Sequence, residues 1–80
     1  MYIKDVDNLK VYGKEFYREL KNIGLEIVQA RQDFDYAEKD FVDAAIYRLK
    51  YLEERFNVLN RKFKEEIPDE LRKTIVDEEI

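Results

Sequence analysis

Eighty residues carry 15 basic and 19 acidic side chains, a net charge of −4, and neither cysteine nor histidine. This length fits one domain, residues 1–80, near the lower limit for a self-sufficient core. Without cysteine and histidine the chain has no disulfide, no thiolate nucleophile, and neither the commonest general base nor the commonest transition-metal ligand. We therefore expect a protein that is not an enzyme and that has no cofactor, catalytic residue or metal site.

The composition also indicates where the chain resides and how it folds. No basic segment followed by an apolar run opens the sequence, and no apolar stretch approaches the ~20 residues of a membrane span. We expect a cytoplasmic location without membrane contact. Two glycines and one proline among many Glu, Lys, Arg and Leu residues favour helix throughout.

The first expected helix covers about residues 7–37, where apolar or small residues recur in alternating steps of four and three. This spacing is a heptad seam, which packs one helix against another as in a coiled coil. The seam residues are Leu9, Gly13, Phe16, Leu20, Ile23, Ile27, Ala30, Phe34, Ala37 and Phe41.

A second seam, one residue out of phase with the first, predicts a second helix over about residues 40–66. Its members are Val42, Ala45, Leu49, Leu52, Phe56, Leu59 and Phe63. The change of phase predicts a turn within about residues 37–40, with Asp40 as a candidate N-cap and Asp43 three residues later. One bent continuous helix is the alternative.

Charges beside the two seams support an antiparallel hairpin. In the heptads, the g positions of the first helix are acidic and those of the second are basic, and g faces g in an antiparallel pair. The predicted ion pairs are Glu19 with Lys62, Glu26 with Arg55, and Asp33 with Arg48. The same register pairs the core residues, for example Ile27 with Leu52. Each exposed pair would contribute only ~0.2–1 kcal/mol, so its value lies in selecting the register.

A short third helix is expected at about residues 68–78. Pro68 suits the first turn of a helix, and Asp69 and Glu70 complement the helix dipole there. Leu71 and Ile75 give this acidic segment a narrow apolar edge.

Apolar residues outside the seam predict an interface on one flank of the hairpin. The e positions do not show the charge complementarity of the g positions, and Gly24 permits close backbone approach. The predicted interface residues are Val11, Tyr17, Gly24, Leu25, Val28 and Ile46. The tail is too short to cover both helices, so we expect a homodimeric four-helix bundle or an unknown protein partner. Scattered surface residues without a partner are the alternative.

Residues 34–66 resemble the small YaaL-type proteins of Gram-positive bacteria. The matching run reads "FVDAAIYRLK" over residues 41–50, followed by Glu53, Arg55, Phe56 and Leu59. The turn is one residue shorter than is usual in that family, and the tryptophan that often precedes it is missing. The resemblance implies a cytoplasmic helical hairpin and supplies no catalytic residue.

Other functions find less support in the sequence. The basic run "RKFK", residues 61–64, together with Arg48 and Arg55, suggests a weak nucleic-acid site. The predicted ion pairs neutralise part of this set, and the acidic tail could lie against it, so we do not expect nucleic acid as the partner. The interpretation is a small interaction or regulatory protein acting through the apolar flank. A structural homodimer without other partners, or a weak nucleic-acid binder, is the alternative.

Overall fold

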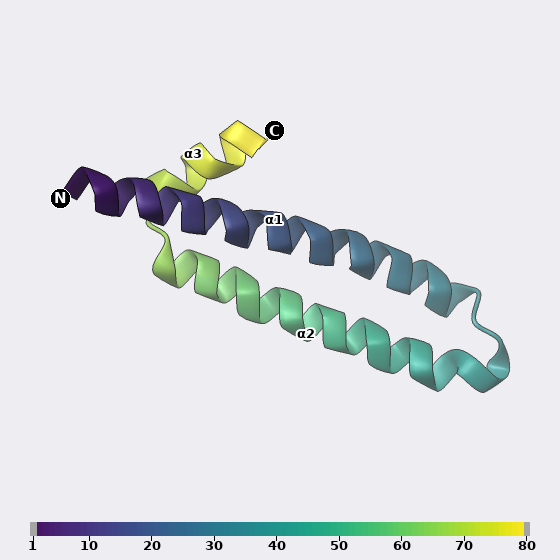
Figure 1. The fold of residues 1–80 in the computed structure, drawn as a ribbon. Helices are drawn as coiled ribbons and strands as arrows, with labels where there is room; N and C mark the ends of the chain where they lie inside the picture. Colours follow the sequence, from purple (N-terminus) through teal and green to yellow (C-terminus); the bar gives the residue numbers. More distant parts are fainter. Residues whose placement is uncertain (1, 80) are drawn as a thin grey trace.

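Three α-helices build the part of the chain that the computed structural model describes, which is the backbone of residues 2–79 and the side chains of residues 7–79. They are α1 (Tyr2–Asp35), α2 (Val42–Glu66) and α3 (Asp69–Glu79), and this part contains no strand. In Figure 1, α1 and α2 run antiparallel side by side, and α3 lies across α1 near its N-terminal end. The predicted all-helical antiparallel hairpin with a short third helix is confirmed.

The chain reverses between α1 and α2 through residues 36–41. The Phe41 amide donates a hydrogen bond to the Glu38 carbonyl at 2.8 Å and closes a 3₁₀ turn, η1 (Lys39–Phe41). The predicted N-cap at Asp40 is wrong, because Asp40 already lies inside this turn. α2 begins at Val42 instead, and its N-cap residue Phe41 makes no side-chain capping bond.

The first helix begins at Tyr2, earlier than the expected residue 7. Residues 2–6 contain neither glycine nor proline, so nothing local stops the helix from extending in this direction.

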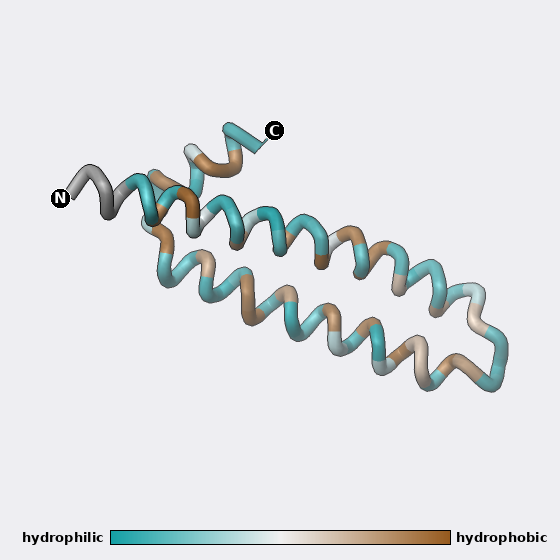
Figure 2. The backbone as a smooth tube through the Cα atoms, in the orientation of Figure 1, coloured by the Kyte–Doolittle hydropathy of each residue, from teal (hydrophilic) through white to brown (hydrophobic). Residues whose placement is uncertain are grey.

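The core follows the seam between α1 and α2 and comprises two clusters that share Phe56 and Leu59 at their boundary. Apolar residues recur along both long helices and in the middle of α3 (Figure 2). The cluster nearer the turn contains only hairpin residues, and the other includes residues from α3 and the segment before it. Their buried members are Ile23, Ile27, Ala30 and Leu52 in the first, and Phe16, Leu20, Phe63, Ile67 and Ile75 in the second.

The crossing of α3 over α1 takes place at Gly13. A Cβ atom at this position would lie 2.5 Å from Ile75 Cδ1 and 3.4 Å from Ile67 Cδ1. Gly13 has no positive φ, so this glycine provides space and not an unusual backbone conformation. The missing side chain lets Ile67 and Ile75 become fully buried, each with 0% exposure. Burying one isoleucine contributes about 1.5–3 kcal/mol.

The connection between α2 and α3 is short. Ile67 is extended, with φ −113° and ψ 122°, as expected for a residue before proline. The Pro68 carbonyl then accepts a hydrogen bond from the Arg72 amide at 2.9 Å and starts α3. The third helix therefore matches its predicted bounds to within one residue.

Candidate interaction site

One side of the hairpin is joined by polar contacts between α1 and α2. Arg48 binds Asp33 at 2.9 Å, and Arg55 binds Glu19 at 2.9 Å. Near the open end of the hairpin, the Tyr12 hydroxyl donates a hydrogen bond to Glu66 at 3.1 Å. Partial desolvation, followed by this bond to Glu66, raises the pKa of Tyr12, so its hydroxyl stays a neutral donor. The g positions thus form the ion-paired side of the molecule.

The pairing along this side differs in part from the predicted one. Asp33 and Arg48 pair as expected, but Arg55 takes Glu19 in place of Glu26. In consequence the expected Glu26–Arg55 and Glu19–Lys62 pairs are wrong, and among the described residues neither Glu26 nor Lys62 has an ion-pair partner. The heptad register brings carboxylates near arginines, but the long arginine side chain can reach more than one carboxylate. The free energy of an exposed ion pair is too small for the register to predict which carboxylate the arginine binds.

The other side of the hairpin contains an apolar groove of about 400 Å³. Its floor comes from the seam, and α3 closes one end. The main lining residues are Tyr17, Leu20 and Gly24 of α1, Phe56 and Phe63 of α2, and Val76 of α3. We call this groove, together with Val28 one turn beyond Gly24, the open face.

Two of the predicted interface residues, Tyr17 and Gly24, line the open face. The Tyr17 ring is half-buried and stacks on Phe63 with 6.3 Å between ring centroids, and Lys21 Nζ lies 5.5 Å from the Tyr17 ring centre. Gly24 is different, since an added Cβ there would meet no atom within 4 Å. The α1 wall of the groove is therefore packed by an aromatic ring near α3 and is formed by bare backbone two turns further along.

The remaining predicted interface residues are distributed more widely. Val28 is 54% exposed and continues the open face toward the turn. Val11 and Leu25 are 59% and 69% exposed and lie outside the groove. Ile46 is half-buried near the start of α2 and does not line the groove. The structure thus brings together only part of the predicted set.

The e positions also carry a charge contact that the sequence interpretation overlooked. Arg31 lies 3.9 Å from Glu53 across this side of the hairpin. The idea that the e positions lack charge complementarity is therefore wrong at this point. The opposite charges of Arg31 and Glu53 at facing e positions could have predicted this contact from the sequence. The apolar part of the open face ends before this pair.

A second polar cluster joins α3 to α1. Lys10 and Lys14 bind the Glu78 carboxylate at 2.7 Å and 2.9 Å, and Arg18 lies 3.4 Å from Glu79. Hydrogen bonds from Lys10 and then Lys14 hold the pKa of Glu78 below its ordinary value of 4.5. The suggestion that the acidic tail lies against the basic residues of α2 is wrong, because it lies on α1. The signal was the spacing of three basic residues by four, which places them on one helix face.

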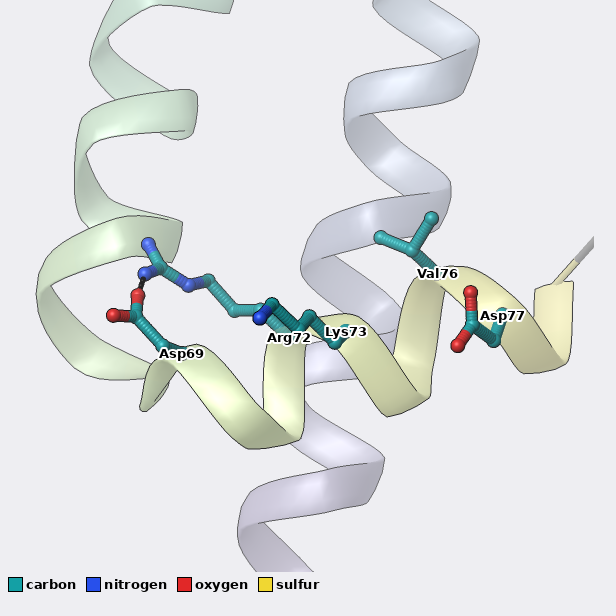
Figure 3. A pocket seen from close by; sticks show the side chains of 5 residues that line it. All are labelled: Asp69, Arg72, Lys73, Val76 and Asp77. Carbon is teal, nitrogen blue, oxygen red and sulfur yellow. Dashed lines mark ion pairs between the residues drawn. The ribbon is translucent and has the colours of Figure 1, made fainter.

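The outer edge of α3 has a further shallow depression of about 280 Å³, shown in Figure 3. Asp69 and Arg72 form an ion pair at its start, and Val76 stands on α3 beside α1. All of its lining residues come from this one short helix, namely Asp69, Arg72, Lys73, Val76 and Asp77. Its charged groups pair with each other or lie in solvent, so the depression supplies no convergent binding groups.

The described residues form neither a metal site nor a membrane span. No group of three or more acidic side chains is arranged to hold a metal ion among the residues that the structure describes. Within the same part of the chain, no helix has the length and apolar character needed to cross a bilayer. The convergent features of this part are the open face and the α3 contact.

Comparison with known proteins finds no family model, no curated protein and no solved structure that matches the chain. The similarity of residues 34–66 to YaaL-type proteins therefore stays a prediction from the sequence.

Proposed function

We propose that this protein acts as a non-enzymatic helical interaction module whose open face pairs with the open face of a second copy. The product is a four-helix bundle with two-fold symmetry, in which each hairpin covers the other. The observation that carries this proposal is the groove of the open face, with an apolar floor and bare backbone at Gly24.

The shape of the single chain supports a second layer. The molecule measures 58 × 21 × 16 Å, and its radius of gyration is 16.3 Å. A compact 80-residue chain has a radius of gyration of about 12 Å. The difference arises because α3 covers only one end, so most of the hairpin is a single layer of two helices.

The exposed area leads to the same inference. The chain exposes 6424 Å², whereas a compact monomer of 9.8 kDa exposes about 5,200 Å². The excess of about 1,200 Å² is larger than the ~800 Å² that each partner buries in a standard stable interface. The chain as a whole therefore exposes more surface than a second copy would need to bury, without any change in the fold.

Gly24 explains how the two layers would approach. Small residues let helix backbones come close together, and in a two-fold symmetric contact the same position on both copies can meet near the axis. Val28, on the adjacent turn, would add an apolar side chain to the contact. The Tyr17 ring would close the side nearer α3.

Sedimentation equilibrium over a wide range of concentrations tests this proposal. We expect the wild-type mass to rise from 9.8 kDa toward twice that value, with little dependence on salt because the contact is apolar. Gly24→Leu should weaken the dimer by at least about fivefold, since overpacking of a fitted interface costs about 1–3 kcal/mol. The monomer should keep its fold, because the added side chain extends into open space.

Asn22→Leu is the matched control, since Asn22 is exposed on the same helix and lies outside the groove. This variant gains the same side chain and should dimerise like the wild type. Val28→Glu should weaken association in the same way as Gly24→Leu, by placing a charge in the contact. A wild-type protein that stays monomeric throughout, or a Gly24→Leu variant that associates as tightly as the control, would refute the proposal.

A further inference from the structure

α3 packs on the surface of α1 and is attached to the hairpin only by a short connection at one end. It packs mainly against α1 and is connected to the hairpin through Ile67 and Pro68. One apolar side chain, Ile75, occupies the notch that Gly13 leaves in α1. Three and four residues later, Glu78 and Glu79 bind a row of basic side chains, Lys10, Lys14 and Arg18. Notch and basic row together form a recognition surface on α1, which we call the α3 site.

α3 depends on this site for its structure. It has 11 residues, and isolated helices shorter than ~12–15 residues are marginal in water. Its ion pairs are partly exposed, so each contributes only modestly. The reverse dependence is weaker, because the core cluster around Ile23 and Leu52 contains no residue of α3. The α3 site can thus become vacant while the central part of the hairpin remains packed.

We propose that the α3 site is an exchangeable docking site for an acidic amphipathic helix of a partner protein, with α3 as its resident occupant. The required pattern is an apolar residue followed by carboxylates three and four positions later, as in Ile75, Glu78 and Glu79. This inference does not depend on self-association through the open face.

The chemistry of the α3 site favours a helix over a nucleic acid. A phosphate backbone would satisfy the basic row, but it offers no apolar group for the notch at Gly13. Residue Ile75 fills that notch with 0% exposure, so the apolar contact is as complete as any in the core. A partner helix reproduces both parts of the contact, and a polyanion reproduces only one.

The exchange has a definite energetic condition. A tethered occupant competes at an effective concentration in the millimolar range for a short linker. A partner helix displaces α3 only when the ratio of its concentration to its dissociation constant exceeds the ratio of this effective concentration to the dissociation constant of α3. Extra contact is available next to the site at Leu9 of α1, which is partly exposed and packs against the core cluster that contains Ile75. A helix longer than α3 would reach it.

The two glycines provide the measurement. Protein labelled with ¹⁵N in glycine gives two amide signals, from Gly13 inside the α3 site and from Gly24, about 16 Å away along α1 at 1.5 Å per residue. Full-length Ile75→Asp is designed to release the resident helix by placing a charge in the notch, and Glu78→Lys/Glu79→Lys is designed to release it by setting like charges against the basic row. Loss of hydrogen-exchange protection in residues 69–79 shows whether α3 has left its site. Circular dichroism shows whether the hairpin stays folded. The probe is a synthetic peptide with the sequence of residues 67–80.

We expect the peptide, at concentrations up to millimolar, to move the Gly13 signal of both vacated variants back toward its wild-type position. Wild-type protein should need more peptide, because its own α3 competes. Adding Lys10→Glu/Lys14→Glu to the Ile75→Asp variant should weaken binding by about tenfold. Lys50→Glu/Lys64→Glu, two exposed charge reversals on α2, is the control and should leave binding unchanged.

Three results would overturn the proposal. The first is a Gly13 signal that the peptide does not move in either vacated variant. The second is equal binding to the charge-reversed and control proteins. The third is a DNA duplex that shifts the Gly13 signal at concentrations as low as the peptide does, since it would assign the site to nucleic acid. Failure of self-association would appear separately, as a monomer in sedimentation.

Discussion

The same substitution at the two glycines of α1 separates helix propensity from packing. Replacing glycine by alanine inside a helix stabilises it by about 0.5–1 kcal/mol. At Gly24 the new Cβ meets no atom within 4 Å, so Gly24→Ala should show the whole gain. For a chain of this size about 1 kcal/mol raises Tm by roughly 4–8 °C. The measurement belongs at a concentration where sedimentation shows the protein to be monomeric, so that association does not contribute.

At Gly13 the same gain is opposed by a clash. The new Cβ would lie 2.5 Å from Ile75 Cδ1, so Ile75 must shift or α3 must move away from α1. Partial loss of an isoleucine burial worth about 1.5–3 kcal/mol outweighs the propensity gain. We expect Gly13→Ala to be between neutral and about 2 kcal/mol less stable than the wild type.

Thermal and urea unfolding followed by circular dichroism measures both variants, and hydrogen exchange of residues 69–79 reports on α3 alone. Gly13→Ala should lose protection in α3, and Gly24→Ala should keep it. Equal stabilisation of the two variants with unchanged protection in α3 would refute this account of the crossing.

Three further results are expected. Lowering the pH should weaken the docking of α3. Hydrogen bonds from Lys10 and Lys14 of α1 depress the pKa of Glu78, so its contribution is present above its ordinary value of 4.5 and is lost as the pH falls through the lower folded value. The Gly13 amide shift should report this transition, which should be less steep in Glu78→Gln, and an identical pH profile would contradict the assignment. Leu52→Ala should cost about 2–5 kcal/mol in urea unfolding, because Leu52 is buried in the core cluster nearer the turn. A cost below about 1 kcal/mol would speak against that packing. A double-mutant cycle on Asp33 and Arg48 should give a coupling of no more than about 1 kcal/mol, because both side chains are half-exposed, and a larger value would mean that the pair does more than select the register.

The hairpin could be predicted because its seams obey a simple periodicity. The phase change at Phe41 and Val42 located the turn, and the acidic and basic g positions gave the orientation of the helices. The pairing of Asp33 with Arg48 follows from that register. The register does not predict whether Arg55 pairs with Glu19 or with Glu26. The two possible ion pairs are both exposed, and the difference between their energies is small.

The α3 site lay beyond the sequence argument for a different reason. Gly13 occupies a seam position, so the pattern assigned it to contact between α1 and α2, whereas it provides the notch for Ile75. The spacing of Lys10, Lys14 and Arg18 was visible, but the direction in which α3 leaves Pro68 decides which basic row it meets. That direction comes from the extended backbone of Ile67 and its burial against α1, which are tertiary properties.

The resident occupant of the α3 site also contributes a side chain to the open face, and this links the two proposed surfaces energetically. Val76 belongs to α3 and closes one end of the open face. A second copy that packs against Val76 binds better when α3 is docked, and by thermodynamic reciprocity it stabilises α3 on its site by the same factor. A partner helix that displaces α3 removes this wall and weakens self-association. On these two proposals, α3 couples occupancy of the α3 site to self-association through the open face. The coupling acts through the Val76 side chain and needs no rearrangement of the hairpin.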